Sequence, residues 1–469
     1  HCMSFFSDLE KFGENIAILQ DNGESVTYSE LCFFSDTLEP QVRQRTLVFI
    51  LCTNSIASIA GYVAFLRNNI VPVLVDSKLD KTLLHHLVET YEPAYIWAPS
   101  GSLQDFEGVY STEYHGYSLL RTSFPIEMDM YPELALLLTT SGSTGSPKLV
   151  RQSYKNIEAN TNSIIEYLAI VSDDRPITTL PMGYTYGLSI INTHLQAGAT
   201  ILATETTLMQ KEFWNFLKKE KATTFGGVPY TYQMLNRLRF FNMNLPSIRY
   251  ITQAGGKLSA DLSLKVATSA AEKGFKFVVM YGQTEATARM SYLPPDRAID
   301  KYGSMGIAIP GGEFWIQDDG GNKITENEVV GELVYRGANV TLGYAEKKED
   351  LALGDERGGI LVTGDMAKRD ADGFYYIVGR KKRFLKIFGS RVNLDETERL
   401  LLDKGYVCAC TGVDDRMSVY TENQGKEQEI QKFLAELLSL NSSAFVVKYI
   451  ESIPKNESGK TLYSGLENL

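Results

Sequence analysis

The stretch LALLLTTSGSTGSPK, residues 134–148, joins an apolar run to a loop of glycine, serine and threonine. The run LALLLTT (134–140) is typical of a buried strand. In the loop, glycines allow backbone N–H groups to turn toward an anion, hydroxyl groups add donors, and Lys148 adds a positive charge. Because ligands often lie on loops at the carboxyl ends of parallel strands, the stretch predicts either a phosphate-binding loop or a surface turn.

The spacing of this loop differs from that of the Walker A motif. In G-x-x-x-x-G-K-[ST] the lysine directly follows a glycine, whereas here Ser146 and Pro147 separate Gly145 from Lys148. A kinase, an ATPase and an acid-activating ligase all need a phosphate cradle, so the loop alone leaves the reaction open.

Apolar runs alternate with amphipathic stretches around this loop. The chain has 469 residues, which exceeds one simple core and predicts two or three domains. Amphipathic stretches lie at 55–68 and 211–222, and the strand-like runs are TLVFILC (46–52), NIVPVLVD (69–76), AYIWAP (94–99), ITTLPM (177–182) and ATILAT (199–204). This alternation predicts parallel sheets covered by helices.

The pattern changes after about residue 295. Short runs with Gly and Asp turns, such as GELVYRG and DGFYYIVGR, predict a small β subdomain. Beyond the basic stretch GRKKRFLKIFGSR (379–391), mixed segments predict a compact α+β unit that ends near residue 469. The predicted fold is therefore α/β, with a large N-terminal domain of two helix-covered sheets plus a small β subdomain, and a small α+β C-terminal domain.

Charge and composition limit the partners. The formal net charge of −11 argues against nucleic acid or an anionic membrane as the main partner. No apolar run is long enough to span a bilayer, and the first residues lack the basic end and apolar stretch of a signal peptide. Cysteines 32, 52, 408 and 410 show no zinc-binding spacing, so we expect reduced thiols in a cytoplasmic protein.

Three further stretches carry candidate chemistry. In VVMYGQTEATARM (278–290), Tyr281 offers a stacking face for a flat ring, and a hydroxyl and a carboxylate follow it. Asp365 follows the run ILVTG, where a carboxylate can accept hydrogen bonds from a ribose diol, and Arg380 comes fifteen residues later. Lys460 follows Gly459 in PKNESGK (454–460). Each stretch alone is also compatible with a solvated turn.

In their order and spacing, these motifs resemble those of the AMP-forming adenylating superfamily, which includes acyl- and aryl-CoA synthetases, peptide-synthetase adenylation domains and firefly luciferase. The resemblance covers essentially the whole chain. The family's phosphate loop resembles TTSGSTGSPK, its adenine and Mg²⁺ motif YGQTE, its ribose motif TGD, its hinge GRKKRFLKIFGSRV and its catalytic-lysine motif PKNESGK. The resemblance implies that a carboxylate attacks the α-phosphate of ATP, that pyrophosphate leaves, and that a thiol acceptor, CoA above all, then takes the acyl group and releases AMP.

The resemblance also implies a role for each motif residue. Lys460 would bridge the carboxylate and the α-phosphate, Thr284 would contact the α-phosphate region, and Glu285 would ligate Mg²⁺. Adenine and ribose would be held by Tyr281, Asp365 and Arg380. The β- and γ-phosphates would be held by Ser141, Gly142, Ser143, Thr144, Gly145 and Lys148.

Lys382 matches the family's hinge position. The resemblance thus implies an N-terminal adenylation domain of residues 3–379, a hinge at 380–383 and a mobile C-terminal domain of residues 384–469. Rotation at the hinge would remove Lys460 and admit the acceptor, and Lys386 and the Gly389 turn would then face the site. A nucleic-acid patch is the alternative use of these basic residues, which the acidic total disfavours.

Three stretches are implied as walls of the acid pocket. LPMGYTYGLS (180–189) has Tyr184 where relatives often have a histidine gate, and no Asp occurs between Pro181 and Ile191 to pair with an α-amino group. GVPYTY (227–232) and QAGGKLS (253–259) supply the other walls. Packing in the core is an equal alternative for each tyrosine. A small polar-aromatic slot predicts a short or aromatic acid, and the candidates are Tyr184, Tyr186, Val228, Tyr230, Gly255, Gly256, Gly282 and Thr287.

Four functions remain open at this point. They are an acid–CoA ligase, a stand-alone adenylating enzyme that loads a carrier-protein pantetheine or an amine, a P-loop kinase or ATPase, and a regulatory protein with a degenerate nucleotide site. The presence of Lys148, Glu285, Asp365 and Lys460 argues against the last. Leu149 stands where relatives mostly have a glycine after the lysine, and the chain is short, which bears on the acceptor more than on adenylation.

Overall fold

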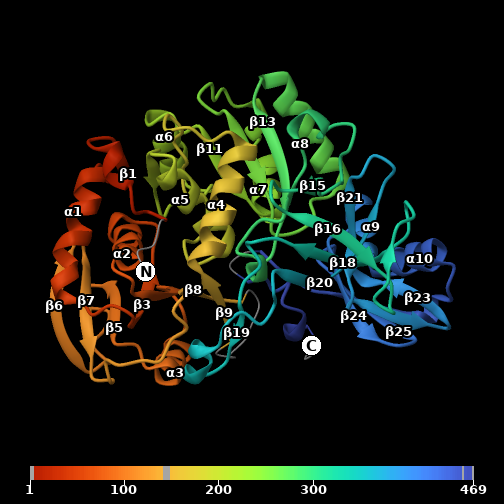
Figure 1. Ribbon diagram of the computed structural model, residues 1–469. Coiled ribbons are helices and arrows are strands. Elements are labelled where there is room, and N and C mark those ends of the chain that lie inside the picture. Colours follow the sequence, from red (N-terminus) through yellow and green to blue (C-terminus); the bar gives the residue numbers. More distant parts are fainter. Residues whose placement is uncertain (1–4, 141–147, 457–458, 467–469) are drawn as a thin grey trace.

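The computed structural model describes residues 5–140, 148–456 and 459–466 (Figure 1). Strands β8 and β9, on either side of residues 140–148, are neighbours in an eight-stranded sheet of the order β19-β9-β8-β4-β3-β5-β7-β6. Its strands are β3 (Leu47–Cys52), β4 (Val71–Asp76), β5 (Tyr95–Pro99), β6 (Gly108–Tyr114), β7 (Tyr117–Thr122), β8 (Leu134–Thr139), β9 (Leu149–Ser153) and β19 (Gly343–Ala345).

The centre of this sheet is parallel and buried on both faces. Strands β5, β3, β4 and β8 pair in parallel, while the outer strands pair antiparallel. In β3, Val48 and Ile50 pack with helix α2 (Ile56–Arg67), whereas Leu47 and Phe49 pack with α3 (Lys81–Tyr91). Two buried faces explain why these strands are continuous apolar runs rather than alternating ones.

A second layer is built from two sheets that single bridges join. The orders are β10-β1-β2 and β11-β12-β13-β14-β15, and residues 176 and 177 bridge β11 and β10. The strands are β1 (Ile16–Gln20), β2 (Ser25–Thr27), β10 (Ile201–Ala203), β11 (Thr224–Gly227), β12 (Tyr250–Gln253), β13 (Lys276–Tyr281), β14 (Ser291–Tyr292) and β15 (Ile307–Ala308).

The predicted strand ITTLPM (177–182) is wrong. Only Pro176 and Ile177 make bridges, after which the hydroxyls of Thr178 and Thr179 donate to the carbonyls of Thr204 and Gly226. Side-chain hydrogen bonds thus replace a strand ladder, and the chain turns into helix α5 at Thr185.

Helices separate and cover the two layers, as Figure 1 shows for α4 between β8 and β11. Side-chain caps begin several of them: Thr27 and Glu30 form a capping box at α1, and Ser153 and Asn156 form one at α4. The remaining bounds are α1 (Tyr28–Leu38), α4 (Tyr154–Leu168), α5 (Thr185–Gln196), α6 (Lys211–Lys219), α7 (Pro229–Arg237) and α8 (Ala260–Lys273).

Two smaller units complete the chain, beside each other on the right of Figure 1. The β subdomain is the sheet β17-β16-β18-β20-β21, formed by β16 (Glu313–Gln317), β17 (Lys323–Ile324), β18 (Gly331–Arg336), β20 (Ile360–Arg369) and β21 (Tyr375–Arg380). The C-terminal unit contains β22 (Phe384–Ile387), β23 (Ser390–Asn393), α9 (Leu394–Asp403), β24 (Cys408–Val413), β25 (Arg416–Thr421), α10 (Glu427–Leu438) and β26 (Phe445–Tyr449).

The predicted α/β architecture, with two helix-covered sheets, a β subdomain and an α+β C-terminal unit, is confirmed. The turn between β21 and β22 falls at residues 381–383, and Lys382 is exposed there. Among the described residues, we find no helix that is both long and apolar enough to cross a membrane.

Buried His194 predicts how the stability of the fold responds to acid. The Ile190 carbonyl accepts from Nδ1 at 2.7 Å, and Nε2 accepts from the Tyr250 hydroxyl at 2.8 Å, so the ring is held neutral. Burial lowers the pKa of His194 to about 4, from an ordinary value of 6.5. Between these values the unfolded chain binds a proton that the folded protein does not, so the free energy of unfolding falls as pH falls.

We expect this histidine to cost the wild-type protein about 2 kcal/mol of unfolding free energy between pH 7 and pH 5. Urea denaturation at the two pH values measures the change. His194→Gln should lose correspondingly less on acidification, and exposed His86→Gln should behave like wild type. Equal losses in wild type and His194→Gln would contradict the assignment.

Candidate active site

A cavity of about 2060 Å³ lies where the second layer, the β subdomain and the C-terminal unit meet. Side chains from many distant stretches line it, including Thr140 just after β8, the β13 turn, β20, β21 and the segment after β26. The predicted nucleotide and catalytic residues among them are Tyr281, Thr284, Glu285, Asp365, Arg380 and Lys460. The loop residues Ser141, Gly142, Ser143, Thr144 and Gly145 lie outside the described residues.

Asp365 and Arg380 form an ion pair at one wall of the cavity. They are direct partners in the antiparallel register of β20 and β21, and Arg380 Nη1 lies 3.2 Å from Asp365 Oδ1. Asp365 Oδ2 also accepts from the Tyr281 hydroxyl and, at 2.9 Å, from Gln283 Nε2. Burial raises the pKa of Asp365, and Arg380, Tyr281, Gln283 and Lys460 oppose that rise.

Glu285 sits in a short 3₁₀ turn, Thr284–Ala286, that begins after β13. The backbone carbonyl of Glu285 accepts from both the N–H and the hydroxyl of Thr341, which fixes the turn. Its carboxylate accepts from the Tyr344 hydroxyl at 2.9 Å. The described residues hold no group of three acidic, His or Cys side chains suited to a metal, so a cation here needs oxygens from a ligand.

The Tyr344 ring, whose hydroxyl donates to Glu285, is also contacted by two cationic side chains. Lys148 Nζ lies 3.8 Å from the centre of the Tyr344 ring, and Arg357 Cζ lies 4.9 Å from it. Lys148 itself is absent from the cavity lining, whereas Tyr344 and Arg357 belong to it. Two cations next to one carboxylate make this corner suited to an anionic ligand that carries a divalent cation.

The segment with Lys460 belongs to the C-terminal unit and lines the cavity, and Lys455 and Thr461 form an antiparallel bridge there. The Asn456 N–H donates to the Lys460 carbonyl at 2.8 Å, and Asn456 Oδ1 accepts from the Lys460 N–H at 2.9 Å. Gly459 has φ +82° and rests on Tyr230, whose Cβ would lie 3.3 Å from a Cβ at position 459. Lys455 Nζ lies 5.4 Å from the centre of the Tyr230 ring.

Opposing charges surround Lys460. Withdrawal from bulk water lowers the pKa of its ammonium group and Arg380 lowers it further, while Glu285 and Asp365 raise it. Lys460, Arg380, Glu285 and Asp365 all line the same cavity, so their charges influence one another there. A cation so placed can stabilise negative charge that develops beside the Asp365–Arg380 pair.

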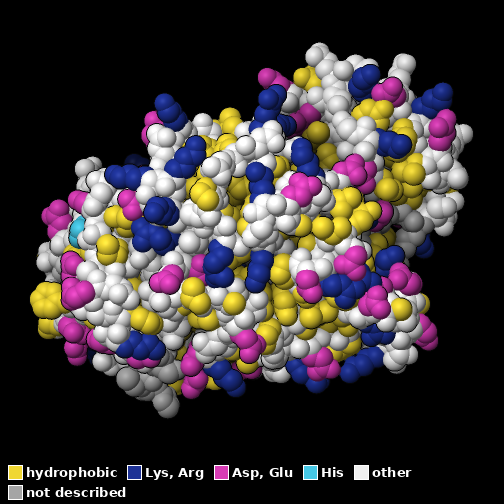
Figure 2. All heavy atoms as spheres, turned by 90° about the horizontal axis from the view of Figure 1, so that it is seen from above, with side chains coloured by type: hydrophobic (Ala, Val, Ile, Leu, Met, Phe, Trp, Pro, Cys, Tyr) yellow, Lys and Arg dark blue, Asp and Glu magenta, His cyan; other side chains and the backbone are white. Residues whose placement is uncertain are grey.

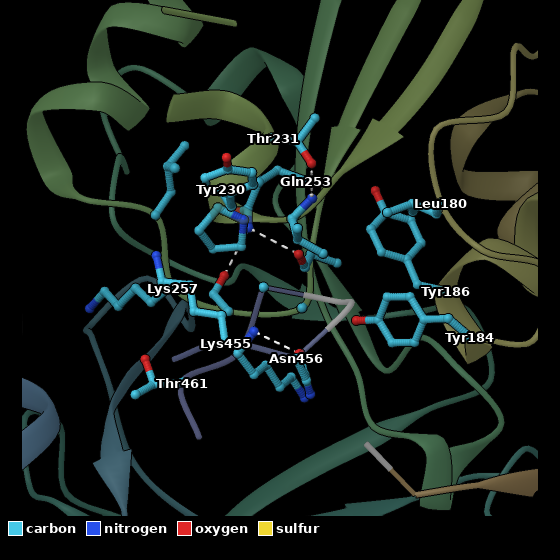
Figure 3. Close-up of a pocket in the computed structure, with 18 of the residues that line it drawn as sticks. Leu180, Tyr184, Tyr186, Tyr230, Thr231, Gln253, Lys257, Lys455, Asn456 and Thr461 are labelled. Atoms are coloured by element: carbon cyan, nitrogen blue, oxygen red, sulfur yellow. Dashed lines mark hydrogen bonds between the residues drawn. The ribbon is translucent and has the colours of Figure 1, made fainter. Parts of the chain in front are cut away.

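The predicted acid-pocket residues line a neighbouring part of the same cavity (Figure 3). Tyr184 and Tyr186 lie on one side, and Tyr230 and Lys257 lie on the other. The Tyr186 hydroxyl shares a hydrogen bond of 2.6 Å with Thr252 Oγ1 and is barely exposed. The other predicted residues in the lining are Val228, Gly255, Gly256 and Gly282.

Of the predicted pocket residues, Gly255 lines the cavity and Thr287 does not. Gly255 has φ +83°, and a Cβ there would lie only 2.7 Å from the Tyr184 hydroxyl, so glycine lets that ring approach. Thr287 is absent from the lining, because its hydroxyl donates to the Asn339 carbonyl at 2.6 Å and points into the protein.

Contacts cross the turn at Lys382 and hold the C-terminal unit against β21. Asp395 Oδ2 accepts from the backbone N–H of Arg380 across the turn at 2.8 Å, and Arg383, which follows the turn, holds the same carboxylate by donating from Nε to Oδ1 at 3.0 Å. Asn393 Nδ2 donates to the Val378 carbonyl at 2.9 Å. These contacts fix the orientation in which Lys460 enters the cavity.

Several residues that line the cavity were not predicted from the sequence. Gln283 lies inside the motif YGQTE, between the predicted residues Tyr281 and Thr284. Its place in that motif could have marked it as a residue of the same site. Tyr344, Arg357 and Asp395 carry no motif of their own, and only the pairing of β19 with β9 and the packing of α9 bring them to the site.

On the face drawn in Figure 2, basic and acidic side chains are interspersed, and neither kind forms one continuous patch. The basic residues after β21 are partly engaged in ion pairs, such as Lys381 with Glu332 and Arg383 with Glu398. This distribution gives that face no basic stripe of the kind that binds a nucleic-acid backbone.

Comparison with known proteins shows the family. The model of the AMP-binding enzyme family matches residues 5–345. A 2-succinylbenzoate–CoA ligase from Bacillus pumilus is 27% identical over 406 residues, which are 83% of this chain and 80% of that protein. A feruloyl-CoA synthase from Amycolatopsis is 28% identical over 354 residues, 72% of this chain and 70% of that protein.

Solved structures share the fold. The o-succinylbenzoate CoA synthetase MenE from Bacillus subtilis, in complex with the acyl-adenylate intermediate OSB-AMP, superposes with a TM-score of 0.80 at 22% identity, covering 99% of this chain and 98% of that one. ATP-bound MatB from Rhodopseudomonas palustris gives a TM-score of 0.76 at 19% identity, with 98% of each chain covered. The prediction of an AMP-forming adenylating enzyme of the acid–thiol ligase kind, which acts on a carboxylic acid, is confirmed. The chain belongs to the family of AMP-binding enzymes.

Proposed function

We propose that this enzyme uses ATP and Mg²⁺ to convert a carboxylic acid to an acyl-adenylate, and then transfers the acyl group to CoA. The observation that carries the proposal is the convergence of Lys460, Glu285 and the Asp365–Arg380 pair on one cavity. The substrate carboxylate is ionised near pH 7, so adenylation needs no general base. It needs placement and neutralisation of charge, which these side chains can supply.

Each predicted nucleotide residue has a place in this proposal. Asp365 and Arg380 hold the ribose, Tyr281 lies against adenine, and Thr284 faces the α-phosphate. Glu285 holds Mg²⁺, which when bound neutralises phosphate oxygens. Lys460 bridges the carboxylate and the α-phosphate, and the β- and γ-phosphates rest on Lys148 and the loop at 141–145.

The acid is short or aromatic in this proposal. Tyr184, Tyr186 and Val228 give the pocket aromatic and apolar walls, and the relatives named above act on 2-succinylbenzoate and form feruloyl-CoA. CoA is favoured as acceptor because those relatives are a CoA ligase and a CoA synthase. Loading of a carrier-protein pantetheine or an amine is the alternative, and comparing AMP release with CoA and with carrier proteins separates them.

The proposal includes a rotation of the C-terminal unit. We take residues 3–379 as the adenylation domain, 380–383 as the hinge around exposed Lys382, and 384–469 as the moving domain. The present arrangement, with Lys460 in the cavity, suits adenylation. After rotation the hairpin of Lys386 and Gly389 faces the site instead. A cytoplasmic location accords with the described cysteines, which are all free thiols.

The first experiment is a screen for acid-dependent exchange of pyrophosphate into ATP. Lys460→Ala should abolish exchange, a loss of about 10²-fold or more, yet spare transfer from a pre-made acyl-adenylate to CoA. Lys448→Ala, an exposed lysine on β26, is the control. Formation of ADP without pyrophosphate would instead favour a P-loop kinase or ATPase, and equal loss of both half-reactions would refute the rotation.

Tyr344→Phe tests how Glu285 is held. The change removes the hydroxyl that donates to the Glu285 carboxylate and leaves the ring between Lys148 and Arg357. Because one charge-assisted hydrogen bond is lost, we expect the Mg²⁺ concentration for half-maximal exchange to rise about 3- to 10-fold. Tyr110→Phe, on the exposed edge strand β6, should leave it unchanged. If Tyr344→Phe needs the same Mg²⁺ concentration as wild type, the hydrogen bond from Tyr344 does not position Glu285 as a metal ligand.

Asp395→Asn tests the contacts across the turn. It weakens the bond to the Arg380 N–H, which crosses the turn, and a bond to the guanidinium of Arg383, which follows the turn on the side of the C-terminal unit. We expect adenylation to slow about 10-fold, while acyl transfer from the adenylate stays within about twofold of wild type. Asp414→Asn is the matched control, because Asp414 accepts from the Lys386 N–H within the C-terminal unit. Slowing of both half-reactions would count against a hinge at this turn.

A further inference from the structure

Arg289 lies at the inner wall of the acid pocket. It is only 2% exposed, yet it belongs to the cavity lining together with Ala288 and Tyr186. Asn160 fixes its backbone: the Asn160 amide donates to the Arg289 carbonyl at 2.8 Å and accepts from its N–H at 3.3 Å. These bonds fix the backbone of Arg289 at the wall of the pocket.

The guanidinium of Arg289 is poorly satisfied by the protein. Its Nε and Nη2 both donate to one atom, Ser189 Oγ, at 3.2 and 2.9 Å. Its Nη1 contacts the Tyr167 hydroxyl and the Met280 sulfur only at 3.5 Å. Arg289 forms no ion pair with any carboxylate of the described residues. A guanidinium has five N–H donors, and a neutral hydroxyl cannot balance its charge.

Other buried charged side chains of this protein have oppositely charged partners. Arg151, which is 0% exposed, pairs with Glu356 and donates to the carbonyls of Tyr344 and Leu353. Buried Asp174 is matched by Arg249 at 2.7 Å. Because the fold supplies partners at these positions, the missing carboxylate at Arg289 is specific to the acid pocket.

The groups around Arg289 carry no compensating negative charge. Burial raises the pKa of Tyr186 to about 12, which Arg289 partly offsets, and burial also raises the pKa of Tyr167. Both hydroxyls are therefore neutral near pH 7. Burial lowers the pKa of nearby His194 to about 4, so that ring is neutral too. A buried charge left in this state costs free energy that a bound anion would offset.

We propose that the acid substrate carries a second carboxylate and that Arg289 binds it. The carboxylate that reacts lies toward Lys460, and the second one receives the Nη donors of Arg289. The Tyr186 ring, 5.2 Å from the guanidinium carbon, packs beside the group that connects the two. This inference rests on the proposed function and narrows it, because the substrate becomes a short or aromatic dicarboxylic acid.

Matched pairs of acids test the inference by pyrophosphate exchange. Suitable pairs are glutarate with pentanoate, adipate with hexanoate, and benzene-1,2- or 1,4-dicarboxylate with the corresponding methylbenzoate. We expect wild-type enzyme to favour a dicarboxylate by about 10²-fold in kcat/KM, since the analogue would leave the guanidinium unpaired. Arg289→Met should lose about that factor with the dicarboxylate and leave the monoacid unchanged or improved.

Further variants keep the test decisive if Arg289→Met folds poorly. Arg289→Lys keeps the charge but not the paired donors, and we expect it to retain part of the preference. Ser189→Ala removes only the hydroxyl that orients the guanidinium and should weaken the preference less. Nucleotide binding and thermal midpoints, measured for each variant, report the fold.

The outcomes separate this inference from the proposed function. Exchange with monoacids alone, or equal loss of both acids in Arg289→Met, would show that Arg289 is structural while the ligase function stands. Absence of exchange with every acid, together with ATP hydrolysis to ADP, would overturn both. A reversed preference in Arg289→Met would establish the second carboxylate and its partner.

Discussion

The pairing of Asp365 with Arg380 is the constraint on which the site depends. The register of β20 with β21 sets the two residues opposite each other, and the cavity, Tyr281 and Gln283 converge on the carboxylate. The backbone N–H of the same arginine donates to Asp395, so the residue that pairs with Asp365 also contacts the C-terminal unit. The end of β21 at Arg380 is therefore both the edge of the cavity wall and the point after which the C-terminal unit begins.

The layers of the fold were predictable because short stretches of sequence show by their apolar pattern whether they are buried on one face or on both. Continuous apolar runs such as 46–52 and 69–76 can be buried on both faces only in a sheet covered by helices, and both became central strands. The run ITTLPM (177–182) was also predicted as a strand but does not form one, because threonine hydroxyls bond neighbouring carbonyls there. The composition of a run predicts whether it is buried. Whether it forms a strand depends on which neighbouring strands can pair with its backbone.

The site was predictable only where residues cluster in motifs. Asp365, Arg380, Glu285 and Lys460 stand in short stretches with a chemical pattern, and the fold brings them to one cavity. Tyr344 and Asp395 depend on tertiary contacts, so nothing in their neighbours marks them. Arg289 was harder to predict. Its proposed role rests on the absence of a carboxylate partner among the described residues around it, and a sequence does not show which side chains will surround an arginine.

The position of Lys382 relative to the ion pair determines what happens to an intermediate. Asp365 and Arg380 both precede the turn, so a rotation about Lys382 would carry away Lys460 and break the Asp395 contact but leave the pair intact. The nucleotide half of an acyl-adenylate would stay clamped while the cation that helped to form it departs. Under the proposed mechanism, the reactive anhydride would thus be retained between the two chemical steps and protected from escape into solvent during the interval in which it is most easily lost.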